Sequence, residues 1–251
     1  MVLVLTQRRE IMKEAIIALI TKANSRKLLY HFTRVRNLPA IAHFNALMSS
    51  YSLNPYFAGE RRVEARKVKL HDYSITLNAH LKIVDSMIDA SSTQEQFRAY
   101  LDRHVFLWPT LKYCQKMWAT YMRREPDERF AILVFDAFSL LSENYSAVKL
   151  SKYDSGSNPR FPAHCTYKKG PNMFLPLHSF QIITNHTVPV KASEIKEILI
   201  EDQVSNLSKH LRSIYVDHIE DIPECWRNLA KPFIDRAPQG TYSQRNNCFD
   251  Y

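Results

Sequence analysis

Glycine is scarce in this sequence. Only Gly59, Gly156, Gly170 and Gly240 occur among 251 residues, whereas an average composition of about 7% would give roughly 18. No two of them lie within ten residues of each other. A Walker loop or a dinucleotide-binding fingerprint needs several closely spaced glycines, because the backbone must approach phosphate. The sequence therefore excludes both kinds of glycine-rich nucleotide-binding motif. Any nucleotide must be held in another way.

The distribution of apolar residues predicts a mixed α+β fold. Hydrophobic residues make up 45% of the chain and charged residues 24%, which is typical of a globular protein. Apolar periodicity predicts helices at 7–24, 37–47, 77–90, 93–103, 109–124 and 203–214, and strands at 27–32, 62–70, 104–108, 130–135, 173–177 and 197–200. These elements do not alternate in a regular βαβ order, so the α+β class follows.

The basic excess is concentrated at the beginning of the sequence. Lys and Arg number 34 against 25 Asp and Glu, which gives a net charge of +9. Residues 1–84 hold 14 basic and 5 acidic residues, whereas residues 85–251 hold 20 of each. This distribution favours a polyanionic partner, such as nucleic acid or a phosphorylated cofactor. A bias toward solubility with no partner is the alternative interpretation.

The cysteines indicate a reducing compartment and no metal site. Cys114, Cys165, Cys225 and Cys248 form no CxxC pair, which argues against a zinc knuckle. Such sparse use is typical of reduced thiols in a cytosol. No stretch approaches the ~20 apolar residues of a membrane span. We therefore expect a soluble, cytoplasmic protein that does not bind a membrane.

The first predicted strand carries a polar face. Side chains alternate along Tyr30-His31-Phe32-Thr33, so His31 and Thr33 share one side. Asn37 follows at the start of a predicted helix, where the helix dipole favours anionic groups. We expect His31, Thr33 and Asn37 to line one cleft that holds a ribose or an amide. The alternative is an edge-strand histidine beside a helix cap.

Two adjacent arginines, Arg61 and Arg62, come shortly before Leu70-His71-Asp72-Tyr73. A guanidinium group pairs with two phosphate oxygens at once, which suits a diphosphate. Neighbours on a strand face opposite ways, so only one of the two can point into a given pocket. The alternative is a solvated basic edge.

The longest predicted irregular segment, residues 151–172, interleaves aromatic and basic side chains. Surfaces that bind single-stranded nucleic acid have this character. The candidate nucleic-acid contacts are Tyr153, Arg160, His164, Tyr167, Lys168 and Lys169. Asp154 is the only acid between Ser151 and Gly170. We expect this loop to cover the cleft, and a flexible surface loop is the alternative.

Taken together, these motifs resemble those of the DarT-type nucleic-acid ADP-ribosyltransferase toxins. Residues 30–38, YHFTRVRNL, resemble the opening motif Tyr-His-x-Thr-x-x-x-Asn-Leu of that family. Arg61-Arg62 followed by residues 70–73, LHDY, resembles its arginine pair ahead of Leu-His-Asp-Tyr. Residues 105–109 and 194–198 resemble its later strands.

A second resemblance is closer. An uncharacterised bacterial family shares the same opening motif, and residues 104–108 and 154–157 stand where that family has an RVFFW strand and a Ser-Gly loop. The resemblance runs from about residue 28 to 215. The expected organisation is therefore an N-terminal helix at 1–27, an ADP-ribosyltransferase-like domain at 28–215 and a helical C-terminal appendage at 216–251.

The resemblance implies a split, strongly bent β-structure with a cleft that binds NAD without a glycine loop. It implies that His31 contacts the nicotinamide-side ribose, and that Thr33, Asn37 and Tyr73 help to hold the cofactor. Arg62, and not Arg61, is implied at the diphosphate, where it stabilises charge as the glycosidic bond breaks. We expect replacement of Arg62 by Ala to abolish transfer with little change in melting temperature.

One position departs from the DarT pattern. Met173 stands where that family has a catalytic glutamate before a Phe-Leu-Val strand. Losing such a group costs factors of ~10² to 10⁴ in rate. Three interpretations follow: the alignment slips in the long loop, another acid such as Asp154 reaches the site, or the domain binds without catalysing transfer.

The leading hypothesis is an NAD-dependent ADP-ribosyltransferase that modifies DNA or RNA and acts as a toxin or defence effector, with an antitoxin as a partner. The alternatives are a catalytically silent module that binds nucleic acid or a nucleotide, and a transferase directed at protein. A carboxyl group in the cleft distinguishes the enzyme from the silent module.

Overall fold

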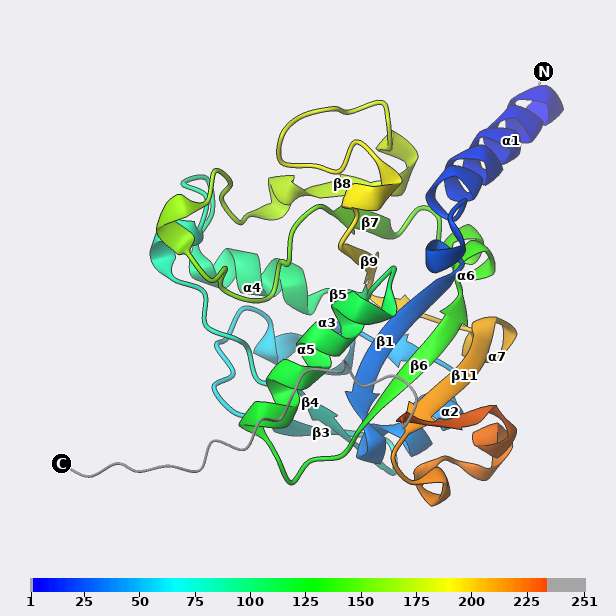
Figure 1. Ribbon diagram of the computed structural model, residues 1–251, viewed down its shortest axis with the longest axis vertical. Helices are drawn as coiled ribbons and strands as arrows, with labels where there is room; N and C mark the ends of the chain where they lie inside the picture. The colour runs from blue at the N-terminus through cyan, green and yellow to red at the C-terminus, as the bar shows by residue number, and fades with distance from the viewer. Residues whose placement is uncertain (1, 234–251) are drawn as a thin grey trace, which may run out of the picture.

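Two four-stranded sheets form the framework of the structure, a computed structural model that describes residues 2–233 (Figure 1). The first sheet has the order β1 (Leu28–Arg34), β6 (Phe130–Asp136), β11 (Leu211–Val216), β12 (Ala230–Pro232). The second has the order β5 (His104–Leu107), β9 (Glu197–Glu201), β7 (Val148–Ser151), β8 (Phe174–Pro176). All neighbours are antiparallel except β11 and β12. With the helices around them, these sheets confirm the α+β class.

Strand β6 shows why the first sheet forms. Its sequence FAILVFD is almost wholly apolar, and six of its seven residues are buried. Alternate side chains enter two different clusters, because strand side chains alternate between faces. Ile132 packs with Tyr30 and Phe32, whereas Leu133 packs with Leu29 and Ile17 of the main core. The sheet is therefore covered on both faces.

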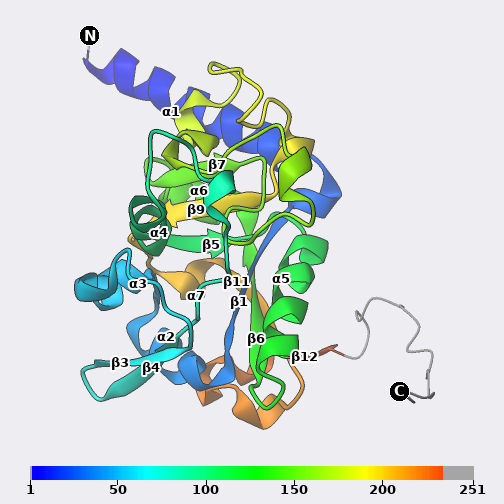
Figure 2. The same cartoon turned by 90° about the vertical axis from the view of Figure 1, so that its left-hand side faces the viewer.

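The two sheets meet at an antiparallel bridge between Tyr30 and Trp108. The Tyr30 amide donates to the Trp108 carbonyl at 2.9 Å, and the Trp108 amide donates back at 2.8 Å. In Figure 2 the strands of the second sheet run across the upper half of the molecule, and β1 and β6 run lengthwise below them. This arrangement agrees with the split, bent β-structure that the resemblance implies.

Short elements complete the fold around the sheets. The helices are α1 (Val2–Ile20), α2 (Leu38–Phe44), α3 (Ser50–Leu53), α4 (Gln94–Asp102), α5 (Leu111–Arg124), α6 (Ala137–Glu143) and α7 (Leu207–His210). Two small antiparallel pairs join β2 (Leu47–Met48) to β10 (Gln203–Val204), and β3 (Arg66–Leu70) to β4 (Tyr73–Leu77). Helix α4 begins where Thr93 and Gln96 form a capping box. Helix α1 projects from the body, with Ile17 and Ile20 buried at its base (Figure 1).

Two predicted helices are wrong. Residues 77–90 contain the end of β4 and then an irregular segment, because backbone groups there pair with distant partners. The His80 amide donates to the Arg62 carbonyl at 2.7 Å, for example. The predicted helix at 203–214 is instead β10, α7 and β11, because Leu211–Val216 pairs with β6. Tertiary pairing overrides local periodicity in both segments.

The segment after residue 215 belongs partly to the first sheet. It forms 3₁₀ turns at Ile219–Asp221 and Glu224–Leu229, and β12 then pairs in parallel with β11. The rest of the predicted appendage, residues 234–251, lies outside the described residues. Cys114, Cys165 and Cys225 are free thiols. Among the helices of residues 2–233, none has the length and apolarity to cross a membrane.

Candidate functional site

A cavity of about 620 Å³ opens where the two sheets meet. This volume lies in the range of small-molecule and cofactor sites. Its walls come from β1, β2, β4, β5 and the start of β9, from helices α2 to α5, and from the segments that precede β3 and follow β4. Apolar residues such as Ile41, Leu47, Ile75 and Trp108 line it alongside a small number of polar groups.

His31 lines this cavity, and only one of its ring nitrogens is paired with the backbone. Its Nδ1 lies 2.8 Å from the Phe106 carbonyl oxygen. A carbonyl can only accept, so Nδ1 carries the proton. Burial lowers the pKa of His31 to about 4, so the ring is neutral near pH 7. The remaining nitrogen, Nε2, therefore keeps a lone pair on a residue that lines the cavity.

The structure brings His31, Thr33 and Asn37 to the same cavity, although Phe32 lines it too, so strand alternation alone does not explain the arrangement. Thr33 is buried in the wall from β1. The Asn37 amide is already paired with β4: its Nδ2 donates to the Thr76 carbonyl at 3.0 Å, and its Oδ1 accepts from the Thr76 amide at 2.8 Å. Asn37 thus holds β4 beside β1 and shapes the wall.

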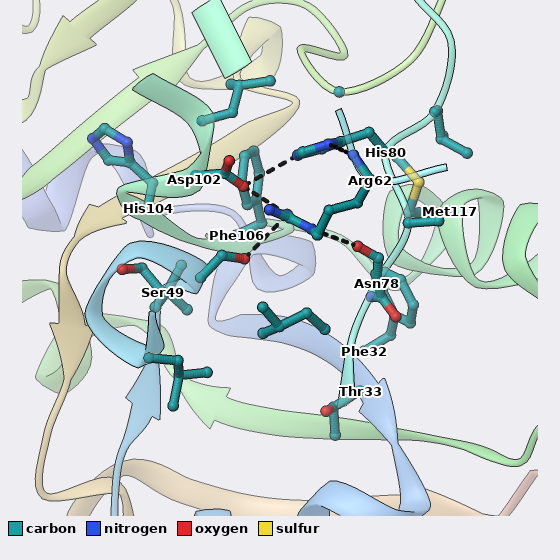
Figure 3. Close-up of a pocket in the computed structure, with 18 of the residues that line it drawn as sticks. Phe32, Thr33, Ser49, Arg62, Asn78, His80, Asp102, His104, Phe106 and Met117 are labelled. Atoms are coloured by element: carbon teal, nitrogen blue, oxygen red, sulfur yellow. Dashed lines mark hydrogen bonds and ion pairs between the residues drawn. The ribbon is translucent and has the colours of Figure 1, made fainter. Parts of the chain in front are cut away.

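Arg62 is the centre of a buried polar network (Figure 3). One of its terminal nitrogens donates to Asp102 Oδ1 at 2.6 Å, and its Nε donates to the Asn78 carbonyl at 3.2 Å. Asp102 Oδ1 also lies 3.1 Å from His80 Nε2, and the Arg62 amide donates to His80 Nδ1 at 3.0 Å. His80 Nε2 therefore carries the proton and donates to Asp102. The other terminal nitrogen of Arg62, Nη1, is buried without a hydrogen-bond partner.

The two adjacent arginines differ in burial, but both line the cavity, so the argument from strand alternation that only one of them can face it does not hold. Arg62 is buried and Arg61 is exposed, and both line the cavity. The predicted strand at 62–70 starts only at Arg66, so residues 61 and 62 lie in irregular backbone. Arg62 is fixed instead by Asp102 at the end of α4, whose pKa is lowered by hydrogen bonds from His80 and Arg62 against the effect of burial.

Tyr73 does not line the cavity, which corrects its predicted role in holding the cofactor. Its ring packs against His43 at 4.7 Å and Phe44 at 5.6 Å between centroids. Phe44 lines the cavity, so Tyr73 supports the wall from behind. The motif around Tyr73 therefore marks the turn between β3 and β4.

The long loop touches the cavity only at Gly156. Asp154 does not line it, and its carboxylate accepts from the Ser157 amide at 3.1 Å in a local turn. This placement corrects the prediction that Asp154 is the catalytic acid. Tyr153 is half-buried and stacks on Tyr167 at 3.7 Å between centroids.

Lys169 is a structural residue rather than a phosphate contact. It is fully buried, and its Nζ donates to the carbonyl oxygens of Asp154, Ser155 and Ser157. Burial lowers the pKa of Lys169, opposed by the nearby carboxylates. Three other loop residues proposed to bind nucleic acid are exposed: Arg160, His164 and Lys168.

Sequence reasoning missed Glu197. This residue begins β9, is 2% exposed and lines the cavity. Its Oε2 accepts from the Ser155 amide at 3.0 Å and from the Ser155 hydroxyl at 2.6 Å. The available indication was a carboxylate at the head of the apolar run EILI, in the predicted strand at 197–200.

The absent glutamate at Met173 leaves no gap in the cavity wall. Met173 is 2% exposed and packs with Phe97, Leu101, Phe174 and Leu199 in a separate apolar cluster. It does not line the cavity. The Met173 position therefore faces a core and not the cavity.

The comparisons with known proteins place the chain in a family. Residues 27–211 match the model of DUF7002, described as a family of unknown function. The chain belongs to this family. The matched segment of DUF7002 contains both sheets up to the start of β11 and all the cavity residues named above. A comparison with curated proteins finds no match.

Two solved structures are similar to this DUF7002 chain. One is Thermus sp. 2.9 DarT in complex with NAD+, with a TM-score of 0.36 and 12% sequence identity, covering 78% of this chain and 84% of that chain. The other is Thermus sp. 2.9 DarT in complex with ADP-ribosylated ssDNA, with a TM-score of 0.35 and 14% identity, covering 76% and 81%. Both likenesses are distant.

Proposed function

We propose that this DUF7002 protein is an NAD-dependent ADP-ribosyltransferase that modifies nucleic acid. The observation that carries the proposal is the shared cavity of His31 and Arg62. These residues come from the two most specific motifs of the sequence, and 30 residues separate them along the chain. By the same resemblance we propose that the protein acts as a cytoplasmic toxin or defence effector with an antitoxin partner.

The polar groups of the cavity suit the two halves of a nicotinamide nucleotide. Nε2 of neutral His31 can accept a hydrogen bond from a ribose hydroxyl. Arg62 lines the same cavity, and a guanidinium group pairs well with the oxygens of a diphosphate. NAD therefore fits the donors and acceptors of the wall.

The rim of the cavity supports a polyanionic target. Arg61 and Lys82 both line the cavity and are exposed, and Asp85 is the exposed acid that lines it among residues 2–233. Arg160 and Lys168 are exposed on the neighbouring loop. Basic groups around an opening attract phosphates from solution, and added salt weakens this attraction. A nucleic acid is the target class that fits this charge.

The test is incubation of the purified protein with NAD and, separately, single-stranded DNA, RNA or a mixture of proteins. Mass spectrometry then looks for an added ADP-ribose, and chromatography measures released nicotinamide. We expect an adduct on nucleic acid, with a rate that falls as salt rises. Adducts on protein alone would support the protein-directed alternative, and NAD binding without nicotinamide release would support the silent module.

A pair of histidine variants separates binding from general damage. In His31→Asn the amide nitrogen takes the place of Nδ1, so the donor to Phe106 is kept while the Nε2 acceptor is lost. One neutral hydrogen bond contributes about 0.5–1.5 kcal/mol, so calorimetry should show about 2- to 10-fold weaker NAD binding. The control, His178→Asn, changes an exposed histidine and should leave affinity unchanged. Equal affinity in both variants would contradict the role of His31.

A further inference from the structure

Three acidic residues line the cavity among residues 2–233: Asp85, Asp102 and Glu197. Asp102 is occupied, because Arg62 and His80 donate to one oxygen and the Gly59 amide donates to the other at 3.2 Å. Asp85 is exposed at the rim. Glu197 is buried, and only its Oε2 is engaged, by Ser155. Its Oε1 has no hydrogen-bond partner among the described residues.

We propose that Glu197 is the catalytic carboxyl group of the transfer reaction, where it contacts the NAD ribose and accepts the proton of the attacking group. This inference rests on the proposed function. In the reaction the C1′–N bond to nicotinamide breaks, and nicotinamide leaves with the bonding electron pair. A new bond forms between C1′ and the nucleophilic atom of the target. That atom's proton passes to the Glu197 carboxylate and then to water.

The position of Glu197 is fixed by the loop that borders the cavity. The Ser155 amide and hydroxyl hold one oxygen, so the carboxyl group cannot rotate freely. Ser155 is held in turn, because the buried ammonium of Lys169 binds its carbonyl at 3.1 Å and those of its neighbours. A side chain held in this way meets the requirement for preorganised catalytic groups.

The protonation of Glu197 suits a general base. Burial is the main cause that raises its pKa to about 8, and the charge of Asp154 adds to the effect. The two hydrogen bonds from Ser155 and the charge of Lys169 act in the opposite direction. A base whose pKa lies near the working pH is partly ionised at that pH. Its carboxylate form is also basic enough to accept a proton efficiently.

Proton release on NAD binding tests this contact without any turnover. The wild-type protein is titrated with NAD by calorimetry at pH 7.5, in two buffers of different ionisation enthalpy. A ribose hydroxyl that donates to Glu197 favours its ionised form, so binding should release a large fraction of one proton. Glu197→Gln cannot ionise, so its binding should release none. The control Glu201→Gln, on the same strand and paired with Lys149, should behave as the wild type.

The rate of transfer gives a second readout. Glu197→Gln should slow ADP-ribose transfer by about 10²- to 10⁴-fold, while Glu201→Gln keeps the wild-type rate. The wild-type rate should rise with pH through an inflection near 8. In Ser155→Ala the inflection should move to higher pH, because the hydroxyl that stabilises the ionised form is lost.

The outcomes separate the two proposals. If the wild-type protein binds no NAD, the proposed function and the role of Glu197 are both overturned. If NAD binds with the same proton release in wild type and Glu197→Gln, only the role of Glu197 is overturned. Because Gln has the shape of a neutral carboxyl group, the variant should keep the wild-type melting temperature, which is checked first.

Discussion

Removing one partner of the ion pair between Arg62 and Asp102 should destabilise the protein strongly as well as alter the site. Its atoms lie 2.6 Å apart, and the two side chains are 4% and 3% exposed. Arg62→Met removes the cation and leaves a buried carboxylate, and breaking a buried pair in this way costs about 3–5 kcal/mol. At roughly 2–4 °C per kcal/mol for a chain of this size, the melting temperature should fall by about 6–20 °C. This result would correct the expectation that removal of the Arg62 side chain leaves stability nearly unchanged.

The chain offers a matched control for this experiment. Arg66 and Glu60 form a pair of almost the same length, 2.7 Å, but their side chains are 39% and 47% exposed. An exposed pair contributes about 0–1 kcal/mol, because water screens it. Arg66→Met should therefore shift the melting temperature by less than about 4 °C. The comparison isolates burial, since the chemistry and the distance of the two pairs are alike.

A double-mutant cycle completes the test. Urea denaturation of Arg62→Met, Asp102→Leu and the double variant should show a smaller loss in the double variant than the sum of the single losses, because neither charge is left alone. His80 and the Gly59 amide still lose their acceptor, so recovery should be incomplete. The reasoning is refuted if Arg62→Met costs no more than Arg66→Met, or if the two single losses simply add.

Three further predictions concern stability. Lys169→Met should lower the free energy of unfolding by about 3 kcal/mol, because three backbone carbonyls lose their donor, whereas the exposed Lys168→Met should change urea denaturation little. Gly59→Ala should destabilise measurably in the same assay, because φ is +79° and the new Cβ would lie 2.9 Å from a carbonyl oxygen of α4; an unchanged midpoint would contradict this geometry. Burial lowers the pKa of both His31 and His104 to about 4. As the pH falls, these imidazoles therefore take up protons in the unfolded chain before they do so in the folded protein, and stability should fall as pH drops from about 6.5 toward 4. Denaturation at pH 7 and pH 4.5 checks this, and His104→Asn should reduce the difference.

The elements that sequence predicts best are those fixed by local pattern. The apolar run of β6 and the capping box of α4 are determined within a few residues of sequence, and both appear close to their predicted bounds. The irregular segment after β4 is different, because its backbone bonds go to Arg62 and to other distant groups. The local pattern of apolar residues in that segment does not indicate which distant groups its backbone will pair with. The helix prediction failed there for this reason.

The residues of the site also divide into those that local sequence motifs indicate and those that depend on distant contacts. His31 and Arg62 stand in short motifs, so their shared cavity could be expected from sequence. Glu197 lies 135 residues beyond Arg62 along the chain, and the residues that follow it in its strand are core residues. Its position comes from the pairing of β9 with β7, where Glu197 lies opposite Ser151, and from the contact with Ser155. Both are long-range contacts, which a single sequence does not display.

The order of strand pairing has a consequence for how the protein is made. Strand β1 pairs with β6, from residue 28 to residue 136, and β5 pairs with β9, from residue 104 to residue 201. Contacts so far apart in sequence are slow to form, because long loops must close first. During translation the cavity cannot acquire its β9 wall until residue 201 has left the ribosome. A nascent chain that stops short of that strand would carry His31 and Arg62 but no complete pocket, so a finished site can form only after β9 has emerged.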